Sequence, residues 1–260
     1  MNNVFQPRLF SGKTVLVTGG GTGIGYAIAL LFGQLDARVI LAARDLERLE
    51  EARKELTGRG IECEVFSLNI RDEAAVQEFY ASLEERELIP DILVNNAGGQ
   101  FTAPALEISA NGFRSVMELN LLGTFNMSKG LAQLAQQHPA ERSIVNIVLC
   151  QEQGIPGMAH AAAARAGVAN LAKTLAWEWA PLGFRVNSVA PGTVRTSGLD
   201  NYDADNLEQA LQKLPIKRMA EPSEVAQAVV YLASPAAGFI TGINLQLDGG
   251  EHLTGVTPQK

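Results

Sequence analysis

The sequence predicts an α/β fold, a single doubly wound domain in which about seven parallel strands form one sheet with helices on both faces. Apolar runs alternate with helical patterns along all 260 residues, and a glycine-rich turn follows the first run. Most of these runs are nearly continuous Val, Ile and Leu, as in strands that are covered on both faces. Because 47% of the residues are hydrophobic, residues 1–260 can share one large core.

The elements follow one another as strand, helix, strand, and the crossovers are expected to be right-handed. The predicted strands are Thr14–Gly19, Ala37–Ala43, Cys63–Ile70, Asp91–Ala97, Ser143–Leu149, Arg185–Pro191 and Ile243–Gly250. The predicted helices are Gly23–Gln34, Asp45–Gly58, Glu73–Arg86, Ser109–Gln137, Ala159–Ala180 and Ser223–Ala233. The long polar segment Thr193–Lys213 follows a strand end and is a candidate lid over the substrate.

Composition excludes several classes of function. A net charge of −7 argues against a general nucleic-acid binder, and no apolar run is long enough to span a membrane. The N-terminus lacks the apolar centre of a secretory signal, and the final "VTPQK" is not a peroxisomal tripeptide. With only Cys63 and Cys150, we expect reduced thiols in a cytoplasmic protein rather than a disulfide framework.

A dinucleotide site is predicted at the turn "TGGGTGIG", between the first strand and the first helix. Glycines without a Cβ let a pyrophosphate approach the backbone, and the helix N-terminus supplies N–H donors. The alternative is an ordinary glycine-rich turn. The residues expected to touch the coenzyme here are Gly19, Gly21, Thr22, Gly23, Ile24 and Gly25.

The end of the second strand favours NADP(H) over NAD. An NAD site usually has an acidic residue here for the ribose 2′-hydroxyl, whereas this strand ends in Ala42 and Ala43. Arg44 follows at once, and a guanidinium matches a 2′-phosphate. Asp45 is expected to cap the next helix. The alternative for Arg44 is a solvated loop charge.

Later strand ends provide the remaining coenzyme contacts. We expect the adenine, the ribose beside the nicotinamide and the nicotinamide carboxamide to lie along successive strand ends. Any one of these segments, taken alone, could be an ordinary turn. In that order the residues are Asn69 and Ile70; Asn96, Ala97 and Gly98; and Pro191, Gly192, Val194 and Thr196.

The glycine turn, "NNAG", the "PG" after the sixth strand and "TGINLQLDGG" together resemble the short-chain dehydrogenase/reductase family from about Gly12 to Gly250. The resemblance implies a Rossmann-type fold and a homotetramer or homodimer. It also implies a catalytic Asn, Ser, Tyr and Lys. The Asn falls on Asn120, but the other three fall on or beside Val148, on Ala161 and on Arg165.

The lost tyrosine decides which chemistry to expect. None of Tyr26, Tyr80, Tyr202 and Tyr231 lies in the alanine-rich helix. Arg165 can hold ribose hydroxyls, but its pKa is too high for proton relay. We therefore expect the ordinary oxidation of alcohols and reduction of ketones to be severely impaired.

Longer stretches such as "HAAAARAGVANLAKTLAWEWA" and "LPIKRMAEPSEVA" resemble the peroxisomal trans-2-enoyl-CoA reductases. The related 2,4-dienoyl-CoA reductases also lack the usual tyrosine. The resemblance implies NADPH-dependent reduction of the C=C bond of an enoyl-CoA, so the partner is an acyl-CoA. Such a site needs donors aimed at the thioester oxygen more than it needs a phenol.

The donors of the substrate site remain open from sequence. Gln100 either faces the substrate or caps its segment, Glu152 is either a buried acid or solvated, and His160 is either catalytic or a helix cap. Two other functions also remain possible. One is a catalytically silent nucleotide-binding protein, and the other is a carbonyl or alcohol oxidoreductase with a substitute donor such as His160 or Tyr202.

Overall fold

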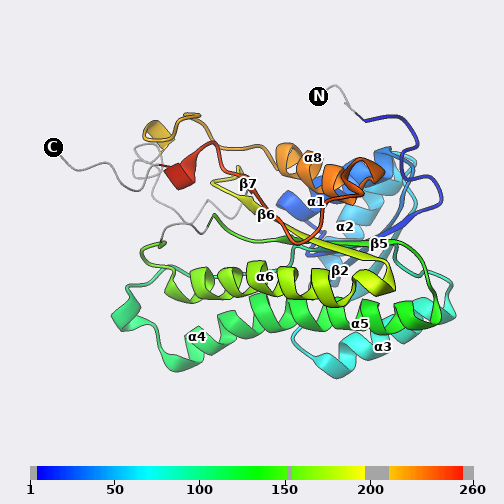
Figure 1. Ribbon diagram of the computed structural model, residues 1–260, viewed down its shortest axis with the longest axis horizontal. Helices are drawn as coiled ribbons and strands as arrows, with labels where there is room; N and C mark the ends of the chain where they lie inside the picture. Colours follow the sequence, from blue (N-terminus) through cyan, green and yellow to red (C-terminus); the bar gives the residue numbers. More distant parts are fainter. Residues whose placement is uncertain (1–4, 151–153, 197–210, 254–260) are drawn as a thin grey trace.

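Seven parallel strands form one sheet in the order β3-β2-β1-β4-β5-β6-β7 (Figure 1). The computed structural model describes residues 5–150, 154–196 and 211–253. The pairing is parallel throughout this sheet, from β2 against β3 at one edge to β6 against β7 at the other. The predicted fold class is confirmed.

The strands and helices alternate along the chain. The strands are β1 (Thr14–Thr18), β2 (Arg38–Ala43), β3 (Cys63–Ser67), β4 (Ile92–Asn95), β5 (Arg142–Ile147), β6 (Phe184–Pro191) and β7 (Asn244–Leu247). The main helices are α1 (Gly23–Gln34), α2 (Leu46–Thr57), α3 (Glu73–Glu85), α4 (Ala110–Met117), α5 (Gly123–Gln137), α6 (Ala159–Glu178) and α8 (Pro222–Ala233). Short 3₁₀ turns are η1 (Ala105–Glu107), η3 (Ala180–Leu182), η5 (Pro235–Ala237) and η6 (Glu251–Leu253).

Each face of the sheet has its own core, because alternate strand residues point to opposite sides. Val15 and Val17 of β1 pack with α1, α2 and α8, whereas Leu16 packs with α3, α5 and α6. Figure 1 shows these two sets of helices above and below the sheet. Burial on both faces explains why the strands are nearly continuous in Val, Ile and Leu.

One predicted helix, Ser109–Gln137, is interrupted. Ser109 caps α4 by accepting a hydrogen bond from Gly112 N at 3.0 Å, as a helix start requires. The π-helical turn η2 (Glu118–Leu122) then separates α4 from α5. Asn120 lies in this turn. A π turn adds a residue to a helix and often marks a functional site, which makes its position beside the sheet informative.

The order in which successive strands are added to the sheet reverses between β1 and β4. β2 and β3 lie on one side of β1, and β4 to β7 lie on the other. Ligands of doubly wound sheets bind at such a switch point, outside the carboxyl ends of the strands. The positions of β1 and β4 therefore locate the candidate site before any side chain is considered.

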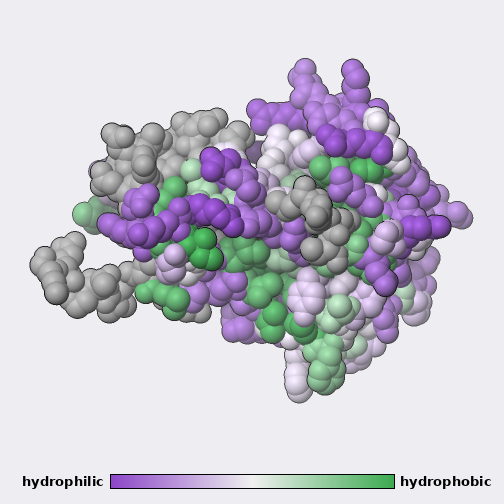
Figure 2. Space-filling view, turned by 90° about the horizontal axis from the view of Figure 1, so that it is seen from above, coloured by the Kyte–Doolittle hydropathy of each residue, from purple (hydrophilic) through white to green (hydrophobic). Residues whose placement is uncertain are grey.

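Within the described ranges, no helix combines the length and the apolar character that crossing a bilayer would need. Figure 2 looks onto the face that carries α8, where hydrophobic residues form patches between hydrophilic ones.

Close packing of α5 against α3 leads to a prediction about stability. Gly130 of α5 faces the Tyr80 ring, and a Cβ there would overlap it. The ring is fixed because the Tyr80 hydroxyl donates to Met127 O at 2.8 Å. Gly130→Ala should lower the free energy of unfolding by about 1–3 kcal/mol, as overpacking typically does. A urea denaturation midpoint would measure it.

Gly154→Ala is the matched control, since Gly154 is exposed and nothing lies within 4 Å of its added Cβ. It should change the free energy of unfolding by less than about 0.5 kcal/mol. Equal midpoints for the two variants would contradict the packing described for Gly130.

Candidate active site

The glycine turn is fixed to the neighbouring strand end by Asn96. The Asn96 Nδ2 donates to Thr18 O at 3.0 Å and to Gly19 O at 3.1 Å. In return the Thr18 hydroxyl accepts from Asn96 N and Ala97 N, both at 3.0 Å. Gly19 adopts a φ of +65°, and a Cβ on Gly25 would collide with Gly19 O. The turn therefore requires these glycines.

The turn opens directly onto the start of α1. Thr22 is the N-cap residue of α1, but its side chain caps no N–H group. Backbone donors at a helix N-terminus attract anions, and the phosphates of a dinucleotide are such anions. Gly19, Gly21, Thr22, Gly23 and Ile24 all line the same crevice. Side chains in place of these glycines would fill the cradle. Because the glycines leave it open, the cradle fits the pyrophosphate of a nicotinamide coenzyme.

The next strand ends carry the basic and amide side chains expected for the adenosine end. Arg44, Asn69 and Ile70 line this part of the crevice. Asp45 caps α2 by accepting from Arg48 N at 3.1 Å, as predicted. Arg48 also lines the crevice, and its Nε lies 3.2 Å from Asp45 Oδ2. The sequence analysis did not name Arg48. It follows Arg44 by four residues and lies in the first turn of the predicted helix, and this spacing could have indicated a second basic residue at the site.

Asn120 uses its amide to hold the loop after β4. Its Nδ2 donates to Gly99 O at 2.8 Å and to Val116 O at 2.9 Å, and its Oδ1 accepts from Gly99 N at 3.3 Å. The side chain is fully buried. These bonds give Asn120 a positioning role, since they fix the Gly98–Gly99 backbone against the π turn.

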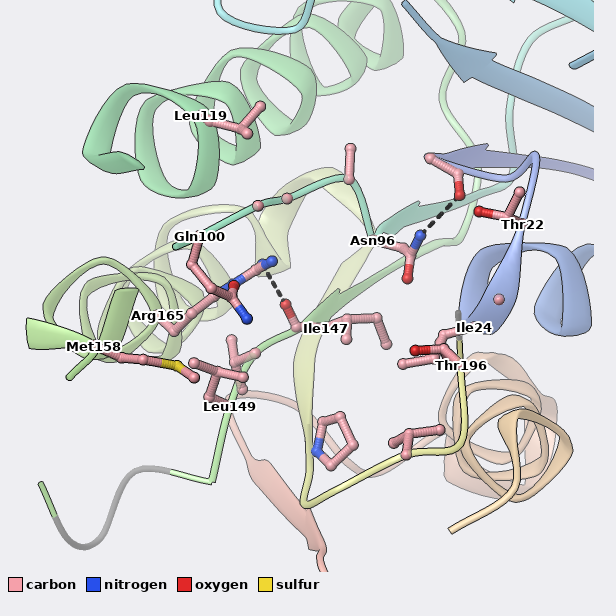
Figure 3. Close-up of a pocket in the computed structure, with 18 of the residues that line it drawn as sticks. Thr22, Ile24, Asn96, Gln100, Leu119, Ile147, Leu149, Met158, Arg165 and Thr196 are labelled. Atoms are coloured by element: carbon pink, nitrogen blue, oxygen red, sulfur yellow. Dashed lines mark hydrogen bonds between the residues drawn. The ribbon is translucent and has the colours of Figure 1, made fainter. Parts of the chain in front are cut away.

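Arg165 reaches from α6 to the end of β5, where its Nη1 donates to Ile147 O at 2.6 Å (Figure 3). The guanidinium is buried, which lowers the pKa of Arg165 to about 10. It lies so close to Gly98 that a Cβ there would overlap it. Within the described part of the chain Arg165 has no carboxylate partner. A buried cation of this kind is suited to ribose hydroxyls or a developing negative charge.

The position expected for a catalytic tyrosine is filled by a methyl group. Ala161 and Ala164 of α6 are fully buried, and Val148 lines the crevice at the end of β5. Tyr26 donates to Glu55, Tyr80 is buried beneath α5, and Tyr231 lies on α8. Among the described residues, no tyrosine lines the crevice. Tyr202 and residues 197–210 of the expected lid lie outside them.

The other predicted catalytic residues differ in their position relative to the crevice. Gln100 lines the crevice. His160 is fully buried and packs edge-on against Phe101, with ring centroids 4.3 Å apart, and it is not one of the residues that line the crevice. Its Nδ1 accepts from Ala161 N at 2.8 Å. The expected catalytic role of His160 therefore gains no support from its position. Glu152 lies outside the described residues.

Acidic and basic groups after β7 form a part of the site that sequence reasoning missed. Cys150, Glu251 and His252 line the crevice beside Pro191, Gly192, Val194 and Thr196. Asp248 links the segment after β5 to the turn after β7, since it accepts from the Cys150 thiol at 3.0 Å and lies 2.7 Å from His252 Nδ1. The stretch "LDGGEHL" held the signal, because acidic residues there follow a strand whose carboxyl end meets the site.

The crevice has a volume of about 1550 Å³. This exceeds the 300–1000 Å³ typical of small-molecule pockets, so it has room for a dinucleotide and a second ligand. One part of its wall is apolar. The apolar side chains there are Phe101, Leu119, Val148, Leu149, Ile155, Pro156 and Met158.

Known proteins share this architecture. A family model described as enoyl-(acyl carrier protein) reductase matches residues 19–252. A peroxisomal 2,4-dienoyl-CoA reductase of Rattus norvegicus is 37% identical over 260 residues, which cover 97% of this chain and 88% of that protein. A probable 2,4-dienoyl-CoA reductase of Caenorhabditis elegans is 36% identical over 257 residues, covering 96% and 83%.

Solved structures agree with these relatives. A citronellol catabolism dehydrogenase of Pseudomonas aeruginosa is 37% identical with a TM-score of 0.87, covering 97% of this chain and 100% of that one. A short chain dehydrogenase of Bacillus anthracis is 34% identical with a TM-score of 0.90, covering 95% and 100%. The chain therefore belongs to the short-chain dehydrogenase/reductase family, whose members are oxidoreductases with a nicotinamide cofactor.

Proposed function

We propose that this protein is an NADP(H)-dependent reductase of the C=C bond of an enoyl-CoA-type thioester. The observation that carries the proposal is the combination at one crevice of a dinucleotide cradle and a buried arginine, without a phenol among the described lining residues. The names of the dienoyl-CoA reductases among its relatives support the same substrate class.

Phosphorylated coenzyme is favoured by charge at the end of β2. Arg44 is exposed there, and the strand ends without an acidic residue that would repel a phosphate. Asp45 is engaged in capping α2 and in pairing with Arg48. When bound, the nicotinamide would supply a hydride to the β-carbon of the substrate. The glycine turn and Asn120 would hold the coenzyme and its loop in place.

Negative charge would then develop on the thioester oxygen. The Arg165 guanidinium and the Gln100 amide both line the crevice and supply N–H donors. Donors held in advance around a developing oxyanion typically contribute about 3–4 kcal/mol each to lowering the barrier. The apolar wall around Leu149 and Met158 suits the acyl chain, whose burial is favourable by about 0.8 kcal/mol for each methylene.

We further propose that the protein assembles as a homotetramer or homodimer. Large apolar side chains are exposed on α4, η2 and α6, namely Phe113 (38% exposed), Leu122 (44%) and Trp177 (86%). Contiguous exposed apolar surface is typical of an interface.

For the location of the protein we propose the cytoplasm, because Cys63 and Cys150 are both thiols, as a reducing compartment favours. The peroxisomal name of the rat relative makes that organelle the alternative.

The substrate class is tested by coenzyme oxidation. The purified full chain should oxidise NADPH with crotonyl-CoA and longer enoyl-CoAs. Its kcat/KM for ketones should be at least about 100-fold lower, because carbonyl reduction lacks the phenol as general acid. Tight NADPH binding without turnover on any substrate would instead favour a silent nucleotide-binding protein. Brisk ketone reduction or alcohol oxidation would favour a substitute donor.

The coenzyme preference is tested at Arg44. Arg44→Ala should weaken NADPH binding about 10- to 100-fold, the loss expected when a charged hydrogen-bond pair worth about 1.5–3 kcal/mol is removed. NADH binding should change less than about twofold, since NADH has no 2′-phosphate. Fluorescence titration of both coenzymes measures this. Arg53→Ala, which removes an exposed arginine of α2 paired with Glu50, is the control. An equal loss for both coenzymes would contradict the assignment.

The acyl wall is tested at Met158. Met158→Trp should reduce kcat/KM for long-chain enoyl-CoAs about tenfold more than for crotonyl-CoA, because displacing roughly two buried methylenes costs about 1.6 kcal/mol. Leu106→Trp is the matched control, as Leu106 is fully exposed outside the crevice. A uniform loss across chain lengths would mean that the acyl chain does not reach Met158.

A further inference from the structure

Reduction of an enoyl thioester leaves one question open, namely which group protonates Cα. Two carboxyl groups lie near the end of β7. Glu251, in the turn η6, lines the crevice, and Asp248 directly follows the strand. The two carboxyl groups have different environments, and those environments assign different roles.

Asp248 is surrounded by hydrogen-bond donors. Its Oδ2 accepts from the Cys150 thiol at 3.0 Å and from His252 N at 2.9 Å, and its Oδ1 accepts from Gly250 N at 3.0 Å. Its side chain is only 3% exposed. Burial opposes ionisation, but the donated hydrogen bonds outweigh it and lower the pKa of Asp248 to about 2. Asp248 is therefore a fixed negative charge.

Glu251 has the opposite environment. Its Oε2 accepts a hydrogen bond from Thr193 N at 3.2 Å. Burial raises the pKa of Glu251 above its usual range, the hydrogen bond from Thr193 lowers it, and the negative charge of Asp248 raises it further. Two carboxyl groups whose pKa values are driven apart divide naturally into a permanent charge and a proton carrier.

The position of Glu251 connects it to the reacting end of the crevice. Its Oε2 lies so close to Gly192 that a Cβ there would overlap it. Gly192 and Thr193 begin the loop after β6, and the same loop contributes Val194 and Thr196 to the crevice. By the family resemblance this loop holds the nicotinamide carboxamide. The carboxyl group would therefore lie at the nicotinamide end of the crevice rather than at the adenosine end.

We propose that Glu251 is the proton donor to Cα and that Asp248 is a positioning residue, which holds the turn that carries Glu251 by accepting from Gly250 N and His252 N. This inference rests on the proposed enoyl thioester reduction. In the step, the Glu251 O–H bond breaks, a Cα–H bond forms with the electron pair of the enolate, and the thioester carbonyl is restored. Glu251 becomes a carboxylate and regains its proton from water at the mouth of the crevice.

Asp248 acts on Glu251 from the end of β7, and Cys150 and His252 in turn contact Asp248. From the β6 loop, Thr193 N donates to the Glu251 carboxyl group. A raised pKa means that the proton is lost only as pH rises through that value. The rate should therefore fall on the alkaline side, and this limb should belong to Glu251.

The test is Glu251→Gln in the full chain, since glutamine keeps the oxygen that accepts from Thr193 N but carries no transferable proton. In the coenzyme-free protein, infrared titration of the wild type should show a protonated carboxyl that persists above the usual glutamate range and is absent in the variant. With enoyl-CoA, kcat should fall about 100-fold. The NADPH Kd should stay within about twofold, since no charge is added or removed beside the phosphates.

Stereochemistry gives a second readout that a merely structural role would not move. In D₂O the wild type should place deuterium on one face of Cα, whereas the variant should give both faces, because water then protonates the enolate. Glu78→Gln, an exposed glutamate of α3, is the matched control and should match the wild type.

The outcomes separate the two proposals. A wild type that reduces enoyl-CoAs, with a variant equal in rate, pH profile and stereochemistry, would overturn the role of Glu251 and leave the proposed function standing. An infrared titration showing Glu251 ionised throughout the neutral range would do the same. A wild type that binds NADPH but turns over no enoyl-CoA would overturn the proposed function, and the role of Glu251 with it.

Discussion

The site depends on one amide, the side chain of Asn96. It joins the carboxyl ends of β1 and β4 by donating to the carbonyl oxygens of Thr18 and Gly19. These two strands lie on either side of the switch point, where a doubly wound sheet opens between its halves. Together with the bonds from Asn96 N and Ala97 N to the Thr18 hydroxyl, this bridge fixes the glycine turn relative to the loop that carries Ala97 and Gly98. A backbone cradle for phosphate works only if its N–H groups are held in place before the ligand arrives.

The same loop sets the shape of the substrate end. Asn120 holds Gly99 from the π turn, and Arg165 occupies the space that a side chain at Gly98 would need. The alanines at 161 and 164 are buried beneath this arrangement. A helix with small side chains can lie close to the strand ends. Arg165 then reaches Ile147 and brings its charge into a desolvated site, where it acts more strongly than it would in water.

Much of the fold could be predicted from sequence because its signals are local. Continuous apolar runs mark strands that are buried on both faces, and Asp45 marks a helix start that the structure confirms. The predicted strands run past the observed ends, as Cys63–Ile70 does against β3, because apolar residues continue into the loops that line the crevice. The π turn at Glu118–Leu122 could not be predicted. A slip of one hydrogen bond leaves the apolar pattern of the helix almost unchanged.

The candidate site divides in the same way. The predicted coenzyme residues follow strand ends in order along the chain, and most of them line the crevice, while their contacts with a coenzyme stay a prediction. Glu152, after β5, was one candidate acid and lies outside the described residues, whereas the structure shows carboxyl groups of contrasting environment after β7. Part of that contrast comes from the hydrogen bond that Cys150 donates to Asp248, and these two residues are 98 positions apart in the sequence. No local pattern can predict such a contact. Burial and a neighbouring charge shift the pKa of a carboxyl group, and both depend on the tertiary structure. Because no tyrosine lines the described crevice, the group that transfers the proton has to be identified from that tertiary structure.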